Sequence, residues 1–293
     1  MGIPVLVTGS KGQLGSEIMV LSPDWKDFEF YFHDIDTLDI TSMDALEEAF
    51  ARIKPFAVIN CAAYTAVDKA ESESEKAFLI NAQAVGHLAQ CAEKYDSWVL
   101  HVSTDYVFDG THHTPYRETD YTNPLSIYGK SKLAGEQLLL EIEKAVVVRT
   151  SWLYSTFGQN IVKTIRRLAS ERDIIGFVCD QIGSPTYAAD LANALLTILK
   201  QLAKAPKNTS LAGIYHYANE GACSWYDFAS TTVELSQLHC KVKPIETHEY
   251  PTPAKRPSFS VLNKSKIKTT FGLEIPWWKE SLEKAIHLMN EIK

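Results

Sequence analysis

The sequence predicts an α/β fold, a Rossmann-like doubly wound parallel sheet with a smaller C-terminal substrate-binding lobe. Three observations support this. Short apolar runs alternate with longer amphipathic segments through the first half of the chain, glycines cluster directly after the first apolar run, and the alternation weakens beyond Thr150. A chain of 293 residues is long enough for one large α/β domain with an attached lobe.

Five strands are expected over residues 4–7, 28–33, 57–60, 98–103 and 145–149, because each is a short apolar run. Helices are expected between them over residues 14–21, 43–53, 75–95 and 127–142, which are amphipathic. The segment Asp39-Ile40-Thr41-Ser42, directly before the second of these helices, is a helix-capping signal. This alternation assigns residues 1–150 to a Rossmann domain, and the glycines after its first strand make it the candidate for NAD(P) binding.

Residues 151–293 are expected to form mainly the smaller lobe, because their elements are shorter and are separated by loops at 181–186 and 251–257. A helix over 187–204 and a strand over 213–218 stand out from this pattern. We expect residues 187–218 to rejoin the Rossmann domain.

Composition excludes several classes of function. The net charge of -7 is spread along the chain without basic clusters, so nucleic acid is not an expected partner. No apolar run approaches the roughly 20 residues of a membrane span and no signal-peptide pattern opens the chain, so we expect no membrane partner and a cytoplasmic location. Five scattered cysteines without a CxxC fit a reducing compartment, and no spacing typical of metal ligands occurs, so no metal is predicted.

Gly9, Gly12 and Gly15 lie between the first strand and the first helix. In this context closely spaced glycines let backbone N–H groups approach a pyrophosphate at a helix N-terminus. The GxxGxxG spacing suits the extended short-chain dehydrogenase/reductase superfamily. A tight turn without a ligand is the alternative interpretation.

Asp34 ends the second strand, where a carboxylate can accept hydrogen bonds from the adenosine ribose. Such a carboxylate favours NADH over NADPH, because the 2'-phosphate would meet like charge. Lys11 and His33 could offset that charge, and Asp34 could instead simply begin a turn. The cofactor is therefore predicted as NADPH or NADH.

Tyr128 and Lys132 are four residues apart in the helix expected over 127–142, which places them on one face. A neighbouring cation favours the phenolate and lowers the pKa of a tyrosine, so Tyr128 is a candidate general acid for carbonyl reduction. Lys132 can also hold the nicotinamide ribose. Thr104, at the end of a strand, can donate a hydrogen bond to the developing alkoxide. A YxxxK pattern alone occurs often by chance, but the three elements in this order favour a reductase.

The chain resembles the dTDP-4-dehydrorhamnose reductase family in residues 12–15, 60–71, 103–108, 124–136, 149–152, 180–186 and in Arg256-Pro257 with Ser260. The resemblance implies reduction of the C4 keto group of dTDP-4-dehydro-β-L-rhamnose to dTDP-L-rhamnose by NADPH or NADH. It implies catalytic roles for Thr104, Tyr128 and Lys132. By the same match, the cofactor would contact Gly12, Gln13, Leu14, Asp34, Asp39, Ile40, Ala63, Tyr64 and Thr65.

The resemblance also places the dTDP-sugar against Thr104, Asp105 and Trp152. The Trp152 ring could serve equally well as core packing. Arg256 is a candidate for the diphosphate, because a guanidinium matches phosphate oxygens, although a surface arginine is the commoner outcome. The chain departs from the usual family pattern at Asn263 and Cys61. Some family members dimerise through magnesium held by acidic residues; those ligands cannot be located in this sequence, so a homodimer stays open and no metal is expected.

Two alternatives to the reductase remain. Dehydratases of the same superfamily follow the threonine with an Asp-Glu pair, whereas Asp105 is followed by Tyr106, which disfavours dehydratase or epimerase chemistry. An NADP-binding regulatory subunit similar to that of methionine adenosyltransferase can retain the YxxxK pattern. Turnover of a reduced nicotinamide separates the two classes.

Overall fold

The computed structural model describes residues 2–206 and 211–291. Its centre is a six-stranded sheet in the order β10-β5-β4-β3-β1-β2, and all of its pairings are parallel. The prediction of a doubly wound parallel sheet is thereby confirmed. The strands are β1 (Ile3–Thr8), β2 (Phe28–His33), β3 (Ala57–Asn60), β4 (Trp98–Thr104), β5 (Ala145–Thr150) and β10 (Gly213–His216).

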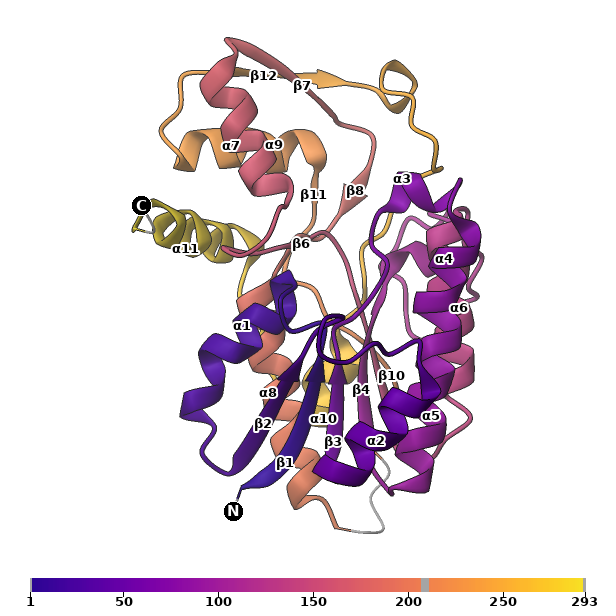
Figure 1. The fold of residues 1–293 in the computed structure, drawn as a ribbon. Coiled ribbons are helices and arrows are strands. Elements are labelled where there is room, and N and C mark those ends of the chain that lie inside the picture. The colour runs from indigo at the N-terminus through magenta and orange to yellow at the C-terminus, as the bar shows by residue number, and fades with distance from the viewer. Residues whose placement is uncertain (1, 207–210, 292–293) are drawn as a thin grey trace.

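Helices cover both faces of the sheet (Figure 1). One face packs against α1 (Gln13–Leu21), α8 (Ala188–Lys204) and α10 (Ser265–Phe271), and the other against α2 (Met43–Ile53), α5 (Ala84–Lys94) and α6 (Ile127–Leu139). Along β1, Val5 and Val7 enter the first core and Leu6 the second. Because both faces are covered, the central strands contain runs of consecutive apolar residues, with the buried polar residues Asn60, His101 and Arg149 toward their carboxyl ends.

The C-terminal half of the chain returns to the sheet. β10 pairs with β5, with Tyr215 opposite Val148, and α8 packs against α1. The sheet therefore ends on an edge strand that lies far along the sequence from its neighbour.

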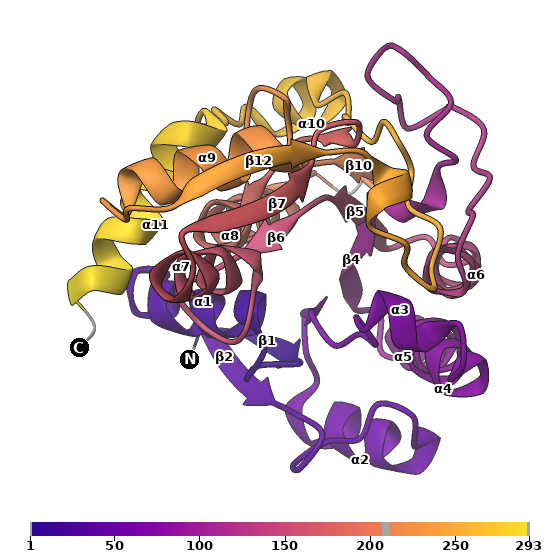
Figure 2. The ribbon, with the colours of Figure 1, turned by 90° about the horizontal axis from the view of Figure 1, so that it is seen from above.

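The smaller lobe lies beyond the carboxyl ends of the sheet strands (Figure 1). Its helices α7 (Ile161–Glu171), α9 (Trp225–Leu235) and α11 (Trp278–Glu291) share one apolar core. β7 (Ile174–Val178) and β12 (Lys241–Ile245) run side by side across the top of the lobe in Figure 2. Shorter pairs join β6 (Leu153–Tyr154) to β9 (Thr186–Tyr187) and β8 (Ile182–Gly183) to β11 (Cys223–Ser224).

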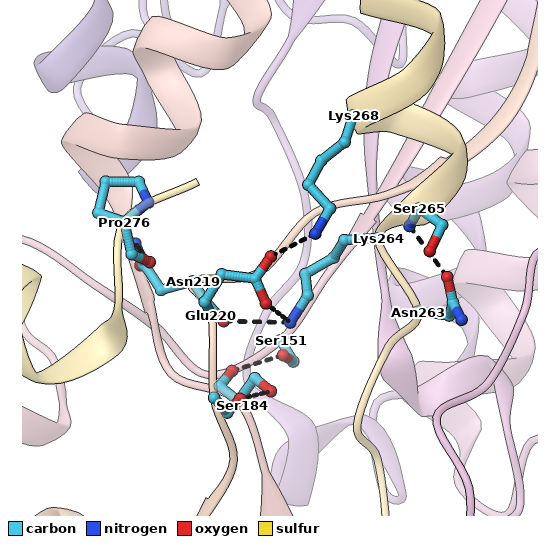
Figure 3. Close-up of polar contacts among 10 residues, drawn as sticks. Ser151, Ser184, Asn219, Glu220, Asn263, Lys264, Ser265, Lys268 and Pro276 are labelled. Atoms are coloured by element: carbon cyan, nitrogen blue, oxygen red, sulfur yellow. Dashed lines mark hydrogen bonds and ion pairs between the residues drawn. The ribbon is translucent and has the colours of Figure 1, made fainter. Parts of the chain in front are cut away.

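A polar cluster after β10 ties the C-terminal segment to the sheet (Figure 3). Glu220 pairs with Lys264 at 3.2 Å and with Lys268 at 2.8 Å, and Lys264 also donates to the carbonyl oxygen of Asn219. Asn263, the unusual residue in the family pattern, accepts a hydrogen bond from the Ser265 backbone N–H at the start of α10. An asparagine oxygen therefore does there what a carboxylate oxygen would do.

The long helix predicted over 75–95 is interrupted. It consists of α4 (Ser74–Phe78), a π-helical turn (Leu79–Gln83) and α5, and it follows the short α3 (Val67–Ala70). The turn places Asn81 so that its side chain accepts from the Tyr64 backbone N–H at 2.8 Å and donates to the Tyr64 carbonyl oxygen at 3.0 Å. These contacts satisfy the backbone of the loop after β3.

No helix within residues 2–206 and 211–291 combines the length and the apolar character that crossing a bilayer requires.

Candidate functional site

A crevice opens between β1 and β3, where the strand order reverses. The chain leaves β1 toward β2 on one side and returns to β3 on the other, so the loops at their carboxyl ends diverge. A cavity of about 570 Å³ fills this position. It is lined by the turn after β1, the loop after β2, the loop after β3 and the α4 region, through Gly9, Lys11, Gly12, Asp34, Ile35, Leu38, Asp39, Ile40, Thr41, Cys61, Ala62, Ala63, Lys76, Leu79 and Ile80.

The turn after β1 is built from backbone. Gly9 has φ of +66°, and a Cβ there would lie 2.5 Å from the Ala62 nitrogen. A Cβ at Gly15 would lie 2.4 Å from the Gly9 carbonyl oxygen, so both positions require glycine. Gly12 precedes α1 with no side-chain cap, and the first turn of α1 has no acidic residue. The N–H groups at the start of α1 are therefore available to an anion beside this cavity.

Asp34 lies at the end of β2 and also begins a turn. Its carboxylate accepts from the backbone N–H groups of Lys11 and Ile35, both at 2.8 Å. The Lys11 ammonium pairs instead with Asp36 at 2.6 Å. Burial, with a smaller contribution from Arg52, lowers the pKa of His33. Lys11 therefore contacts Asp34 through its backbone N–H, while its ammonium pairs with Asp36. His33, whose pKa is lowered, does not pair with Asp34 either.

The residues predicted to contact a cofactor divide into two groups. Gly9, Gly12, Asp34, Asp39, Ile40 and Ala63 line the cavity. The other predicted contacts are not among its lining: Gln13, Leu14, Tyr64, Thr65, Tyr128 and Lys132.

The residues outside the lining have structural surroundings of their own. Leu14 belongs to the core, and the Tyr64 hydroxyl donates to Glu73 at 2.9 Å. Gln13 lies beneath Gly158 of the lobe. Lys76 was missed by the sequence reasoning, because no pattern connects a surface lysine of α4 with this cavity.

The predicted catalytic set meets at the end of β4. Ser126 caps α6 by accepting from the Gly129 N–H at 3.1 Å, and α6 then carries Tyr128 and Lys132 one turn apart. The Tyr106 ring lies edge-on to the Tyr128 ring, with 5.6 Å between centroids. Thr104 at the end of β4 lies close enough to the Tyr128 side chain to oppose in part the effect of burial on the pKa of its phenol, whereas Lys132 Nζ is directed to the Val102 carbonyl oxygen of the same strand.

The expected depression of the Tyr128 pKa is not found. Burial raises the pKa of Tyr128 to about 12, against a hydrogen bond with Thr104 that lowers it. Lys132 Nζ does not act on the phenol because it donates to the Val102 carbonyl oxygen at 2.7 Å and lies 3.2 Å from His101 Nε2. Burial also lowers the pKa of Lys132 to about 8.

Two buried anchors hold α6 against the sheet. Asn81 of the π-helical turn donates to Ser131 Oγ at 3.0 Å. One turn beyond Lys132, Glu136 accepts from Arg149 of β5, with Nη2 to Oε2 at 2.6 Å and Nε to Oε1 at 3.0 Å. Neither anchor was predicted, since each joins residues that are distant in sequence.

Asp105 follows Thr104 and is almost fully buried. Thr104 Oγ1 donates to Asp105 Oδ1 at 3.0 Å, whereas Asp105 Oδ2 has no partner among the described residues. Burial raises the pKa of Asp105 to about 6, against smaller opposing contributions from the nearby hydroxyls of Ser260 and Thr104. The carboxyl group therefore has a free oxygen next to the threonine of the catalytic set.

A second cavity of about 540 Å³ lies on the lobe side and shares Tyr106 with the catalytic end of β4. Its walls come from α7, β7 and the loop before residue 257, and include Phe177, Gln181, Trp225 and Arg256. Arg256 makes a two-point ion pair with Asp68 of α3, at 2.8 and 3.1 Å. This pair connects the lobe to the Rossmann domain at the edge of the cavity.

Trp152 has an unusual backbone conformation, with φ of +48°. Its ring stacks on Trp225 with 3.6 Å between centroids and an interplanar angle of 9°. Trp152 is partly buried against the lobe core and is absent from the cavity lining, whereas Trp225 lines it. The aromatic face in this cavity is therefore that of Trp225, supported from behind by Trp152.

Within the described residues, no group of three or more His, Cys, Asp and Glu side chains is arranged to hold a metal ion.

A parallel sheet with a crevice at its switch point, a helix that carries Tyr128 and Lys132 against β4, and a lobe beyond the carboxyl ends of the strands are the features of an extended short-chain dehydrogenase/reductase. The model of one family, described as the RmlD substrate binding domain, matches residues 3–291. The chain therefore belongs to this family, and several of its curated relatives are named dTDP-4-dehydrorhamnose reductase.

Three relatives illustrate the match. The reductase of Aggregatibacter actinomycetemcomitans is 43% identical over 95% of this chain and 97% of its own length. A crystal structure from Clostridium acetobutylicum is 41% identical, covers 98% of this chain and 99% of that one, and has a TM-score of 0.92. A Bacillus anthracis structure in complex with NADP is 39% identical, covers 98% of this chain and 100% of that one, and has a TM-score of 0.91.

Proposed function

We propose that this chain reduces the C4 keto group of dTDP-4-dehydro-β-L-rhamnose to dTDP-L-rhamnose with NADPH or NADH. The observation that carries the proposal is the position of Thr104, Tyr128 and Lys132 at the carboxyl end of the sheet, with one cavity at the switch point and a second in the lobe. The family relatives named as this reductase support the choice of substrate.

The crevice fits a nicotinamide dinucleotide. The uncapped start of α1 at Gly12 would hold the diphosphate, and Asp34 the adenosine ribose. Leu38 and Ile40 offer an apolar wall for the adenine side, and Lys132 remains the candidate for the nicotinamide ribose. When bound, the cofactor supplies the hydride.

The side chains at the end of β4 supply the proton and the polarisation. Tyr128 is protonated at neutral pH, since burial raises its pKa, and it would donate its proton to the keto oxygen as C4 is reduced. The Thr104 hydroxyl, which donates to Asp105 Oδ1 at 3.0 Å, would rotate to donate to the same keto oxygen instead and stabilise its developing charge. Asp105, with its free Oδ2, would accept a hydrogen bond from a sugar hydroxyl.

The second cavity would take the nucleotide end of the substrate. Trp225 offers a flat face for the base, and Trp152 supports that face. Arg256 would bind the diphosphate, after exchanging the Asp68 carboxylate for phosphate oxygens of the same geometry.

The test is turnover by the purified chain. We expect oxidation of NADPH or NADH when the 4-keto sugar nucleotide is supplied, and a loss of roughly a hundredfold or more in kcat for Tyr128→Phe, because the general acid is removed. Tyr121→Phe is the matched control, since Tyr121 is 85% exposed and should leave the rate unchanged. If the chain binds the cofactor but does not oxidise it in the presence of this substrate, the reductase hypothesis fails and the regulatory-subunit hypothesis takes its place.

The cellular location and the oligomeric state of the protein are two further predictions. We expect a cytoplasmic protein that uses a dTDP-sugar, and a homodimer is the assembly to test by sedimentation velocity.

A further inference from the structure

A chain of buried polar groups runs under the catalytic lysine and crosses three strands. Thr8, Asn60 and His101 are opposite one another in the registers of β1, β3 and β4, and Lys132 of α6 completes the chain. All four residues are almost fully buried. Asn60 Nδ2 lies 3.0 Å from His101 Nδ1, and His101 Nε2 lies 3.2 Å from Lys132 Nζ. The proposed reaction uses only Lys132, so the role of the other three is open.

A backbone amide sets the donor-to-acceptor direction of the hydrogen bonds along this chain of polar groups. The Ala62 N–H donates to Asn60 Oδ1 at 3.2 Å, and the Thr8 hydroxyl donates to the same oxygen at 2.7 Å. Because a backbone N–H can only donate, the carboxamide oxygen of Asn60 must face Ala62. The amide nitrogen of Asn60, which is also only a donor, then faces His101 Nδ1.

The tautomer of His101 follows from the network. Nδ1 accepts from Asn60 and therefore carries no proton. Burial, with a smaller contribution from Lys132, lowers the pKa of His101 well below its usual value, so the ring is neutral. A neutral imidazole has one proton, and in His101 it resides on Nε2.

This N–H points at the lysine nitrogen. An ammonium group has three donors and no acceptor, whereas an amine has a lone pair and two N–H bonds. The amine form of Lys132 can accept from His101 Nε2 and still donate to the Val102 carbonyl oxygen at 2.7 Å. We infer that His101 is a positioning residue that donates to the amine form of Lys132 and so favours that form over the ammonium in the cofactor-free protein.

The other groups that face Lys132 agree with this state. Glu136, on the next turn of α6, is already paired with Arg149. Burial raises the pKa of the Cys61 thiol to about 12, so it is uncharged at neutral pH, and burial likewise keeps the Tyr128 phenol protonated. No unpaired negative charge among the described residues therefore offsets an ammonium here. Burial lowers the pKa of Lys132 to about 8, and the charge of Glu136 only partly opposes this.

The inference deepens the proposed function, on which its kinetic consequence rests. An ammonium beside Tyr128 favours loss of the phenol proton, but to become charged Lys132 must give up the hydrogen bond from His101. A base with a lowered pKa is charged only below that pKa. We therefore expect kcat/KM to fall as the pH rises through about 8, instead of near the usual lysine value of 10.5.

The direct test is the protonation of the His101 ring in the full-length, cofactor-free protein. Long-range 1H–15N NMR distinguishes the two ring nitrogens, and comparison with His101→Gln assigns the signal. We expect a proton on Nε2 and none on Nδ1 at about pH 9, where Lys132, with its pKa lowered to about 8, is mainly the amine. A proton on Nδ1, or on both nitrogens, would overturn the inference.

Asn60→Asp tests the direction of the chain. Both carboxylate oxygens accept, so the substituted side chain would take the Ala62 N–H on one side and a His101 Nδ1–H on the other. We expect the tautomer to reverse and the alkaline limb of kcat/KM to move upward by on the order of one pH unit. Thr8→Val is the matched control, because Ala62 alone still orients Asn60, and both readouts should stay in place.

An unchanged tautomer in Asn60→Asp would contradict the inference. If that variant does not fold, the His101 tautomer measured in the wild-type protein still tests the inference. The NMR result needs no turnover, so a protein with the Nε2–H tautomer but without reductase activity would retain this inference and lose the proposed function.

Discussion

The buried ion pair between Glu136 and Arg149 gives the sharpest prediction about stability. Glu136 lies one turn beyond Lys132 on α6, and Arg149 lies on β5, so the pair connects the catalytic helix to the sheet. Only 1% of the Glu136 side chain and 2% of the Arg149 side chain are exposed. Glu136→Gln keeps the shape of the side chain but leaves the guanidinium unpaired against the Phe108 ring.

The expected cost follows from this burial. Removing one partner of a buried pair leaves an uncompensated charge and costs about 3–5 kcal/mol, a large share of the roughly 5–15 kcal/mol that stabilises a typical domain. With a urea m-value of about 3 kcal/mol/M, the unfolding midpoint should fall by about 1–1.7 M.

Urea unfolding followed by circular dichroism measures this midpoint. Glu141→Gln is the matched control, since Glu141 is exposed near the end of α6 and should change the unfolding free energy by no more than about 0.5 kcal/mol. Replacing both Glu136 and Arg149 by Met should recover most of the loss, because no buried charge remains. A loss below about 1 kcal/mol in Glu136→Gln would refute the reasoning.

Two further predictions concern the joints between the lobe and the Rossmann domain. Asp68→Asn should tighten the binding of dTDP, measured by calorimetry, by up to about fivefold. The reason is that Asp68 competes with the ligand for Arg256 through a partly exposed ion pair worth about 1 kcal/mol or less. Weaker binding would mean that Asp68 positions Arg256. Glu17 of α1 accepts from Ser155 Oγ at 2.6 Å, and burial raises its pKa above the usual 4.5. The protonated acid is therefore favoured in the fold, and stability from this group is lost as the pH rises through its raised pKa. Glu17→Gln should raise the melting temperature at about pH 7 and lose that advantage below about pH 4, and an equal effect at both pH values would contradict the assignment.

The strands could be predicted because each one is buried on both faces. The alternation of Val5, Leu6 and Val7 between two cores produces a continuous apolar run that is visible in sequence. The start of α2 could also be predicted from the sequence, since Ser42 accepts a hydrogen bond from the Ala45 N–H as the capping pattern predicts.

The interruption of the helix over 75–95 could not be predicted from periodicity. It depends on Asn81 satisfying the backbone of Tyr64, and a single amide side chain among helix-forming residues gives no local sign of such a partner. The two-point pair between Asp68 and Arg256 is likewise a tertiary contact between opposite ends of the chain.

The catalytic set was recognised by residue type, whereas its electrostatics depended on the fold. Four-residue spacing predicted a lysine near the Tyr128 phenol, but the Val102 carbonyl oxygen and His101 take its Nζ atom instead. Burial then dominates the pKa of Tyr128, which is raised to about 12. His101 lies inside an apolar strand, and only the register of β3 against β4 reveals its partner Asn60.

The most direct test of the central claim follows the transferred hydrogen. The purified chain would be given dTDP-4-dehydro-β-L-rhamnose with NADPH deuterated at the reactive position of the nicotinamide, and the sugar product would be examined by NMR. Because Thr104 and Tyr128 at the carboxyl end of β4 and the start of α6 are the groups proposed to act on the C4 keto oxygen, we predict deuterium at C4 of dTDP-L-rhamnose. An unlabelled sugar, or deuterium at any other carbon, would contradict the account.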